Sequence, residues 1–481
     1  MIKLYGEQRR VLFLPPDGPI LIKGVAGSGK TTVSLFRAQY LIKTYNNLFN
    51  TANVCIFTFN KTLVKYITWL QKASLCEDLG IPSTLIPVPQ VTTFHSWVYK
   101  FLLDKNIKLE AIDSKEKRDL ISAIKNREKF TNMKGNTDFL VEEFSWIKGK
   151  CIKKKQEYLE IARNGRGAKL SKKDRETVWE MLLEYQNDLH NKHKVDYDDF
   201  ALKMLKWFDE NKNFNPPFTH IVVDEGQDLS KAQIIVLNKL ISPTTNSITI
   251  VADTAQRIYK SGFTWKEVGL CLSKNRSITF DKNYRNTRQI AEAAISLLEK
   301  EEDKEGFTTP EVGTREGPKP YVGIFENVHK EDECIINIIQ NLQESSSTVI
   351  LGHDWNILSR IYNNLKSKRI PCSVLSEKNT SINNNTIVLC TLHSIKGLEF
   401  ENVIISDINK DIFPCLTNID EDDISLQIST ERRLLYTAMT RAHNRLFMLC
   451  FGNPSLFLSD ISQDMTTNNL NEVLYGETGQ L

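Results

Sequence analysis

The sequence predicts an α/β protein with two parallel-sheet domains and a helical insertion in the first of them. Short apolar runs bounded by turn residues alternate with amphipathic stretches, first ahead of residue 300 and again beyond it. Within the first series the composition changes between residues 104 and 191, where lysine and glutamate dominate and strand patterns are nearly absent. We therefore expect a first domain of residues 1–103 and 192–275, an insertion at 104–191, and a second domain at 276–481.

The elements of the first domain follow from their apolar patterns. Continuous apolar runs predict strands buried on both faces of a parallel sheet, at residues 19–24, 53–59, 219–225 and 247–253. Helical spacing of apolar residues predicts helices at 31–45 and 230–241, with a further helix at 287–300 in the second domain. The insertion contains a strongly helical stretch at 175–190.

A second series of apolar runs predicts a second sheet of similar build. Its strands are expected at residues 319–325, 347–353, 386–391, 402–407 and 445–451. The polar residues after 465 are expected to be loosely held.

Composition excludes several classes of protein. Hydrophobic residues make up 41% and charged residues 25%, as in ordinary globular proteins. The net charge of +3 is too small to indicate a nucleic-acid partner, so any such partner must be inferred from local basic patches. No run of 18 or more apolar residues predicts a membrane span. The nine cysteines show no CxxC pattern, and Cys55, Cys390 and Cys450 lie in apolar runs. Reduced core thiols and a cytoplasmic location are expected.

Residues 24–32, GVAGSGKTT, match the pattern GxxxxGK[ST] between a predicted strand and a predicted helix. Glycines allow the backbone to turn so that its N–H groups face phosphate oxygens. Lys30 would reach the β- and γ-phosphates, and Thr31 would hold Mg²⁺ through its hydroxyl. The alternative is a chance glycine-rich turn. The loop residues expected at the nucleotide are Gly24, Ala26, Gly27, Ser28, Gly29, Lys30, Thr31 and Thr32.

A second predicted strand runs directly into acids in residues 221–230, IVVDEGQDLS. Carboxylates this close repel one another, and a metal ion would supply the opposing charge. Asp224 suits the Mg²⁺ shell, and Glu225 suits the general base that activates water for attack on the γ-phosphate. Read alone, the cluster is also consistent with a solvated strand end. Together with the phosphate loop, it predicts hydrolysis of a nucleoside triphosphate.

Further motifs follow in an order that resembles the UvrD/Rep-type superfamily 1 helicases over nearly the full chain. The resemblance implies two RecA-like domains of the P-loop NTPase class, with ATP as the nucleotide. Gln8 stands where the family's Q motif contacts adenine. Gln256, within 251–265, would sense the γ-phosphate. In the motif at 282–290, Tyr284 would stack on the base and Arg285 would contact the γ-phosphate.

The resemblance also assigns residues near the chain's C-terminal motifs. Glu399, in the motif at 390–405, would lie near the ribose, and Arg441, in the motif at 431–442, would be a second arginine finger. Considered alone, Arg441 would be a surface salt-bridge partner. The residues that the resemblance and their chemistry place toward a single DNA strand are Asn60, Lys61, Thr93, His95, Trp97, Tyr259, Trp265, His393, Ser394 and Lys396.

Two features of the strand-binding prediction stay open. Aromatic rings can stack on bases if exposed, but Phe94 and Phe263 are equally consistent with core packing. The basic run at 148–156 is a candidate contact to the nucleic-acid backbone, and a solvated helix face explains it equally well. The segment 185–200 resembles the return from the family's inserted domain.

The predicted function is an ATP-dependent translocase or helicase on single-stranded DNA, moving 3′ to 5′ as the resemblance implies. Arginines from the second domain would complete the site of the first, so hydrolysis would require a closed cleft. Larger family members carry a second helical insertion, but here only residues 376–386 precede the strand of the 390–405 motif. Translocation is therefore a safer expectation than strong unwinding, with or without a duplex junction.

Alternatives remain at this point. The chain could be an ATP-gated regulatory subunit of a partner nuclease or of an anti-phage defence complex, since its acids form no nuclease constellation. It could also act on RNA, although no separate RNA-binding module is recognisable. Oligomeric state and pathway are not predicted.

Overall fold

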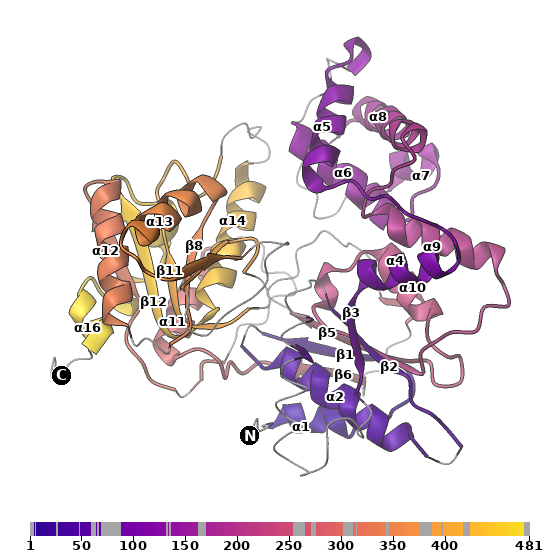
Figure 1. The fold of residues 1–481 in the computed structure, drawn as a ribbon, viewed down its shortest axis with the longest axis horizontal. Helices are drawn as coiled ribbons and strands as arrows, with labels where there is room; N and C mark the ends of the chain where they lie inside the picture. The colour runs from indigo at the N-terminus through magenta and orange to yellow at the C-terminus, as the bar shows by residue number, and fades with distance from the viewer. Residues whose placement is uncertain are drawn as a thin grey trace.

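The computed structural model describes most of the chain between residues 4 and 475. The ranges it leaves undescribed are 1–3, 5, 26, 48, 59–63, 65–66, 69–87, 131–132, 134–135, 162–169, 254–264, 271–275, 302–310, 314, 343–345, 376–386, 396–397, 417–423 and 476–481, together with the side chains of residues 265, 266 and 426. Figure 1 shows two α/β domains side by side, with a helical subdomain beyond the first.

The first sheet has six parallel strands in the order β3-β2-β4-β5-β1-β6. Their bounds are Ile20–Gly24 for β1, Val54–Thr58 for β2, Gln90–Thr93 for β3, His220–Val223 for β4, Ser247–Asp253 for β5 and Ser277–Phe280 for β6. The expected domain boundary after residue 275 was wrong. Leu21 pairs with Ser277 and Gly24 with Phe280, so β6 completes the first sheet instead of beginning the second domain.

Helices cover both faces of the first sheet. One face carries α1 (Glu7–Leu12) and α2 (Lys30–Tyr45), and the other carries α4 (Phe94–Asp104), α9 (Asp199–Glu210) and α10 (Lys231–Lys239). Short 3-10 turns lie at η3 (Gly226–Asp228) and η4 (Trp265–Val268). Because both faces are covered, the four inner strands β1, β2, β4 and β5 are almost entirely buried, as their continuous apolar runs predicted.

The insertion is helical, as expected, and has a core of its own. It contains α5 (Ser114–Lys125), η2 (Glu128–Phe130), α6 (Thr137–Gly149), α7 (Lys155–Glu160) and α8 (Lys172–Asn191). At its root, the Nζ of buried Lys148 lies 2.8 Å from Asp196 and 2.9 Å from Asp199, which belong to the returning chain. These buried ion pairs tie the insertion to the first domain.

The second sheet also has six parallel strands, in the order β7-β12-β11-β8-β10-β9. The strands are β7 (Tyr321–Phe325), β8 (Thr348–Gly352), β9 (Cys372–Val374), β10 (Ile387–Thr391), β11 (Phe400–Ile405) and β12 (Ala442–Phe451). The helices are α11 (Arg288–Glu299), α12 (Val328–Asn341), α13 (Trp355–Ser367), α14 (Ile424–Met439), α15 (Leu456–Asp460) and α16 (Leu470–Tyr475), with η7 at Gln463–Met465. The predicted class of two parallel-sheet α/β domains is confirmed.

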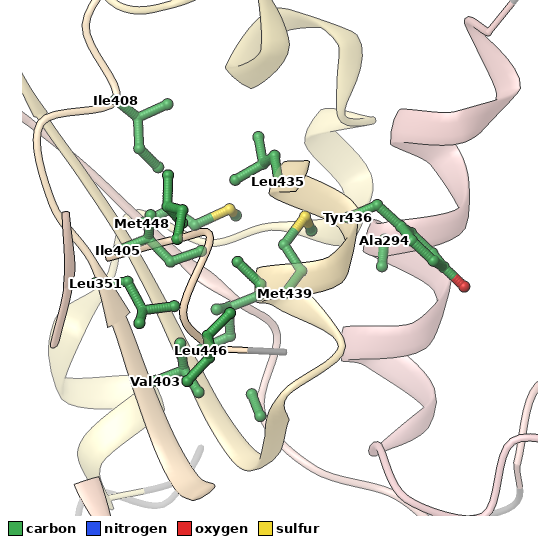
Figure 2. Packing of buried hydrophobic residues seen from close by; sticks show 14 of the residues in the cluster. Ala294, Leu351, Val403, Ile405, Ile408, Leu435, Tyr436, Met439, Leu446 and Met448 are labelled. Atoms are coloured by element: carbon green, nitrogen blue, oxygen red, sulfur yellow. The ribbon is translucent and has the colours of Figure 1, made fainter. Parts of the chain in front are cut away.

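The core of the second domain fixes helix α14, which ends just before Arg441. Figure 2 shows Leu435 and Met439 of α14 among the apolar side chains of the strands, and Tyr436 beside Ala294 of α11. All four side chains are almost fully buried. Densely packed interiors hold side chains in single positions, so the end of α14 is held firmly against the sheet.

Two further expectations concern membranes and thiols. Among the described helices, none is long and apolar enough to cross a membrane. Cys55, Cys390 and Cys450 are buried and carry no disulfide, as predicted for core thiols.

Candidate nucleotide and nucleic-acid site

The phosphate loop joins the end of β1 to the start of α2. Gly27 and Gly29 have φ values of 76° and 79°, in the left-handed region that glycine adopts without strain. A side chain at Gly27 would collide with Asn283, and one at Gly29 would collide with Gln8. The loop therefore requires glycine for its own turn and for the segments that pack against it.

Lys30 begins α2 and lies against the loop. Its Nζ donates to the carbonyl oxygens of Gly24 and Val25, at 3.2 and 2.8 Å, and to Asp253 Oδ2 at 2.9 Å. Asp253, buried at the end of β5, was not singled out from the sequence, although an acid at a strand end beside this loop is a usable signal. The lysine charge is thus held at the place where phosphates would enter.

Asp224 follows β4 and is almost fully buried. Its Oδ2 accepts from Thr31 Oγ1 at 2.8 Å, and its Oδ1 accepts from Ser34 Oγ at 3.1 Å. Burial, and then the neighbouring charge of Glu225, raise the pKa of Asp224 to about 7. A carboxylate beside a hydroxyl at the phosphate loop suits Mg²⁺, which takes one or two protein oxygens and shares the rest with phosphates and water.

Glu225 stands at the turn after β4 with φ of 57°, an uncommon value for a residue with a side chain. Its carboxylate accepts a hydrogen bond from Gln227 Nε2, and Gln227 Oε1 accepts from the N–H of Asp253 at 2.9 Å. This turn aims the carboxylate of Glu225 into a pocket instead of along the strand.

The second domain contributes Arg285 to the same pocket. Arg285 pairs with Glu399, and Glu399 also lies 3.1 Å from His443 Nε2. Although burial disfavours the charge, Arg285 and His443 hold the pKa of Glu399 at about 2. Glu399 therefore stays ionised and keeps the guanidinium of Arg285 at the mouth of the pocket.

Arg441 is buried at the start of β12, with its Nε donating to the carbonyl of Thr437 at 3.1 Å. Burial, and then the charge of Arg285, lower its pKa from the ordinary arginine value. One pocket is lined by residues of both domains: Gly27, Gly29, Lys30, Thr31, Glu225, Asp253, Arg285 and Arg441. The two arginines thus meet the phosphate loop across the domain boundary.

Gln8 and Tyr284, which were expected at the base, both contact the phosphate loop. Gln8 Nε2 donates to the carbonyl of Ser28 at 2.8 Å, which ties helix α1 to the phosphate loop. The N–H of Tyr284 donates to the carbonyl of Gly27 at 3.0 Å, while its ring is 41% exposed. The Nζ of Lys282 lies 5.8 Å from the centre of the Tyr284 ring. The expected stacking of Tyr284 on a base stays a prediction.

Two residues of the motif at 91–97 make contacts within the first domain. The hydroxyl of Thr93 accepts from the N–H of Ser96 at 3.2 Å and caps α4, and its side chain is buried. Trp97 stacks on Phe101 at 5.1 Å and also contacts Phe57 and Phe218. Thr93 thus serves the helix cap, and Trp97 packs in part against the core. Their expected contacts to DNA stay predictions. Phe94 is buried as well, in line with the core-packing alternative.

His95 is partly buried and lies beside an aromatic residue that sequence reasoning missed. Its ring lies 5.3 Å from that of Tyr197, which is half exposed, and 5.6 Å from that of Phe200. Burial lowers the pKa of His95, so the ring is neutral at neutral pH. Tyr197 lies in the returning segment at 185–200. Its position as an aromatic residue among acids could have identified it from the sequence.

In the motif after β10, His393 and Ser394 are exposed. The Oγ of Ser394 lies 2.9 Å from Thr391 Oγ1, which closes the turn. The ring of His353 lies 6.2 Å from that of His393, and its Nε2 lies 3.2 Å from Glu431. These residues share one edge of the second sheet, because Leu392 N–H donates to the Gly352 carbonyl.

His353 leads to a pH prediction. Although burial acts in the opposite direction, the hydrogen bond that His353 donates to Glu431 and the charges of Glu431 and Asp354 raise the pKa of His353. Its stabilising contribution should be fully present below the ordinary value of about 6.5 and lost as pH rises through the higher folded value. His353→Gln should therefore lower the melting temperature more at about pH 6 than at about pH 8.5. An equal loss at both pH values would contradict the assignment.

Comparisons with known proteins agree with this geometry. Residues 4–266 match the UvrD/REP helicase N-terminal domain, and residues 278–380 and 374–453 match the UvrD-like helicase C-terminal domain. The chain belongs to the UvrD/Rep helicase family.

Among similar proteins of the UvrD/Rep family is a "Probable DNA helicase II homolog" of Mycoplasma capricolum, 27% identical over 66% of this chain and 44% of that protein. The ATP-dependent DNA helicase srs2 of Schizosaccharomyces pombe is 26% identical over 75% of this chain and 42% of its own length. The ATP-dependent DNA helicase PcrA of Leuconostoc citreum is 24% identical over 75% and 47%. The chain thus spans less than half the length of these relatives.

Several residues expected at the site of this UvrD/Rep family member lie outside the described part of the chain. They are Ala26, Asn60, Lys61, Gln256, Tyr259 and Lys396, together with Phe263 and the side chain of Trp265. The loop at 376–386 lies outside it as well. Their expected roles stay predictions.

Proposed function

We propose that this chain is an ATP-dependent translocase on single-stranded DNA, coupling ATP hydrolysis to movement between its two RecA-like domains. One observation carries the proposal: a single pocket is lined by Lys30, Thr31 and Glu225 of the first domain and by Arg285 and Arg441 of the second. Guanidinium groups brought to the phosphates from another domain link hydrolysis to the relative position of the two domains.

The residues suggest a sequence of events. Thr31 and Asp224 would hold Mg²⁺, which neutralises charge on the phosphates. Glu225 would accept the proton of the attacking water. Arg285 and Arg441 would stabilise the charge of the transferring phosphoryl group, and its departure would weaken the contact between the domains. Alternating grip by the two domains would then become stepping, and the direction proposed is 3′ to 5′, as the resemblance implies.

Exposed groups on both domains support a strand-binding face. In the first domain Tyr197 is half exposed and lies against the partly buried His95, and in the second domain His393 and Ser394 are exposed. Exposed aromatic rings bind bases without sequence preference, and hydroxyl and imidazole groups bind backbone phosphates.

The proposal is tested by ATP turnover measured without a strand, with single-stranded DNA, and with RNA of matched sequence. We expect turnover to rise many-fold with DNA and much less with RNA. Stimulation by RNA alone would reassign the substrate. ATP binding without stimulation by any strand would overturn the translocase and favour the ATP-gated regulatory subunit.

A further inference from the structure

Two buried asparagines join the phosphate loop to the segment that carries Arg441. Asn286, 1% exposed, donates through Nδ2 to the carbonyls of Thr440 at 3.2 Å and Ala442 at 2.5 Å. These carbonyls stand immediately before and after Arg441. One amide group thus holds the backbone on both sides of the arginine finger.

Asn283, 2% exposed, holds the other end of the same turn. Its Nδ2 donates to Asn286 Oδ1 at 2.7 Å, and its Oδ1 accepts from the N–H groups of Arg285 at 2.9 Å and Asn286 at 3.2 Å. This contact fixes both the direction of the Asn286 amide and the backbone of Arg285.

The Asn283 side chain also rests on the phosphate loop. A Cβ added at Gly27 would lie 2.2 Å from Asn283 Oδ1, and the next residue, Tyr284, donates its N–H to the Gly27 carbonyl. A continuous set of contacts therefore runs from Gly27 through the two amides to the backbone of Arg441. Amides suit this position because each supplies donors and an acceptor, and every one of these groups is buried.

We infer that Asn283 and Asn286 are positioning residues that set the arginine fingers relative to the phosphate loop. The inference rests on the proposed ATPase function and deepens it. Displacement of the phosphate loop by a bound nucleotide would be passed to both arginines together, because Asn283 contacts the loop and Asn286 holds the Arg441 backbone. Neither asparagine lines the pocket, and both would act through Arg285 and Arg441.

The test variant is Asn286→Asp, which keeps the shape but places carboxylate oxygens against two carbonyls. Displacements of about 1 Å from productive geometry cost up to about 100-fold in rate, so kcat should fall by about 10- to 100-fold. KM and ADP affinity should change little, whereas affinity for ADP with aluminium fluoride, a mimic of the transferring phosphoryl group, should fall. Asn402→Asp is the matched control, since Asn402 is fully buried in the same domain and donates to Ser346 and Thr348 instead.

Two further measurements separate positioning from damage to the fold. In an Arg441→Ala background, Asn286→Asp should lower the residual turnover little further. The reason is that both substitutions remove the same contribution, that of Arg441. If Asn286→Asp does not fold, Asn283→Asp serves instead, since it keeps the oxygen that accepts from the two N–H groups. Equal loss of ADP and ADP–aluminium fluoride affinity, additive effects, or wild-type kcat would overturn the inference. Failure of the proposed function would appear separately, as a wild-type chain that no strand stimulates.

Discussion

Replacing Arg441 with alanine should abolish strand-stimulated ATP turnover, with kcat reduced by about 10³- to 10⁵-fold, the usual contribution of an arginine finger. ATP binding should remain measurable, because Lys30 and the phosphate loop belong to the other domain. The side chain is buried and faces Glu225 and Asp253 across the domain boundary. Lysine should not restore the rate, since only the guanidinium pairs with two phosphate oxygens at once.

The Arg441 prediction is checked by steady-state turnover together with binding of a fluorescent ATP analogue. Arg288→Ala is a suitable control, because Arg288 lies at the exposed start of α11 and pairs with Glu316 on the surface. Exposed ion pairs of this kind contribute little to stability. An Arg441→Ala protein with turnover within a few-fold of wild type would remove the reason for assigning a coupled motor.

Changing Glu225 to glutamine should reduce turnover by about 10²- to 10⁴-fold, because the amide cannot accept a proton from water. The substitution keeps the length of the side chain and the turn after β4. It also removes the charge that, after burial, raises the pKa of Asp224, so ATP should bind at least as tightly as to the wild type. In the presence of the strand, the Glu225→Gln protein is expected to accumulate with ATP bound.

The Glu225 result is measured as the release of phosphate in a single turnover, beside nucleotide affinity at equilibrium. Glu210→Gln provides a matched change, since Glu210 is exposed at the end of α9 and pairs with Lys206. Loss of ATP affinity equal to the loss of turnover would show that Glu225 supports binding and is not the base.

Much of the nucleotide site could be predicted because it is encoded locally. The glycines at 27 and 29 determine their own left-handed turns, and Lys30 and Thr31 follow at fixed spacing on one helix. Asp224 and Glu225 end a strand that is recognisable from its apolar run. Since the carboxyl ends of parallel strands meet at one edge of a sheet, these residues were bound to lie together.

The nucleic-acid residues were harder to predict, because exposure depends on what packs from elsewhere. Trp97 is an aromatic residue of the kind that stacks on bases, yet in the fold it packs in part against Phe101 and Phe218. The hydroxyl of Thr93 accepts a hydrogen bond at the start of α4 and so caps that helix. The four residues of β6 have too short an apolar pattern to show which sheet they join, and pairing with β1 decided it.

The amino-acid sequence alone determined the two-domain α/β class, the phosphate loop and the carboxylates beside it, because each depends on spacing within one short segment. Only the tertiary structure decided that Asp253 pairs with Lys30 and that Asn283 and Asn286 link the phosphate loop to Arg441. The contacts from Lys30 to Asp253 and from Asn286 to Ala442 join segments far apart in the sequence, and no local pattern records them. They arise when the elements of each sheet and the two domains pack together, because buried amides and charges are stable where they find partners.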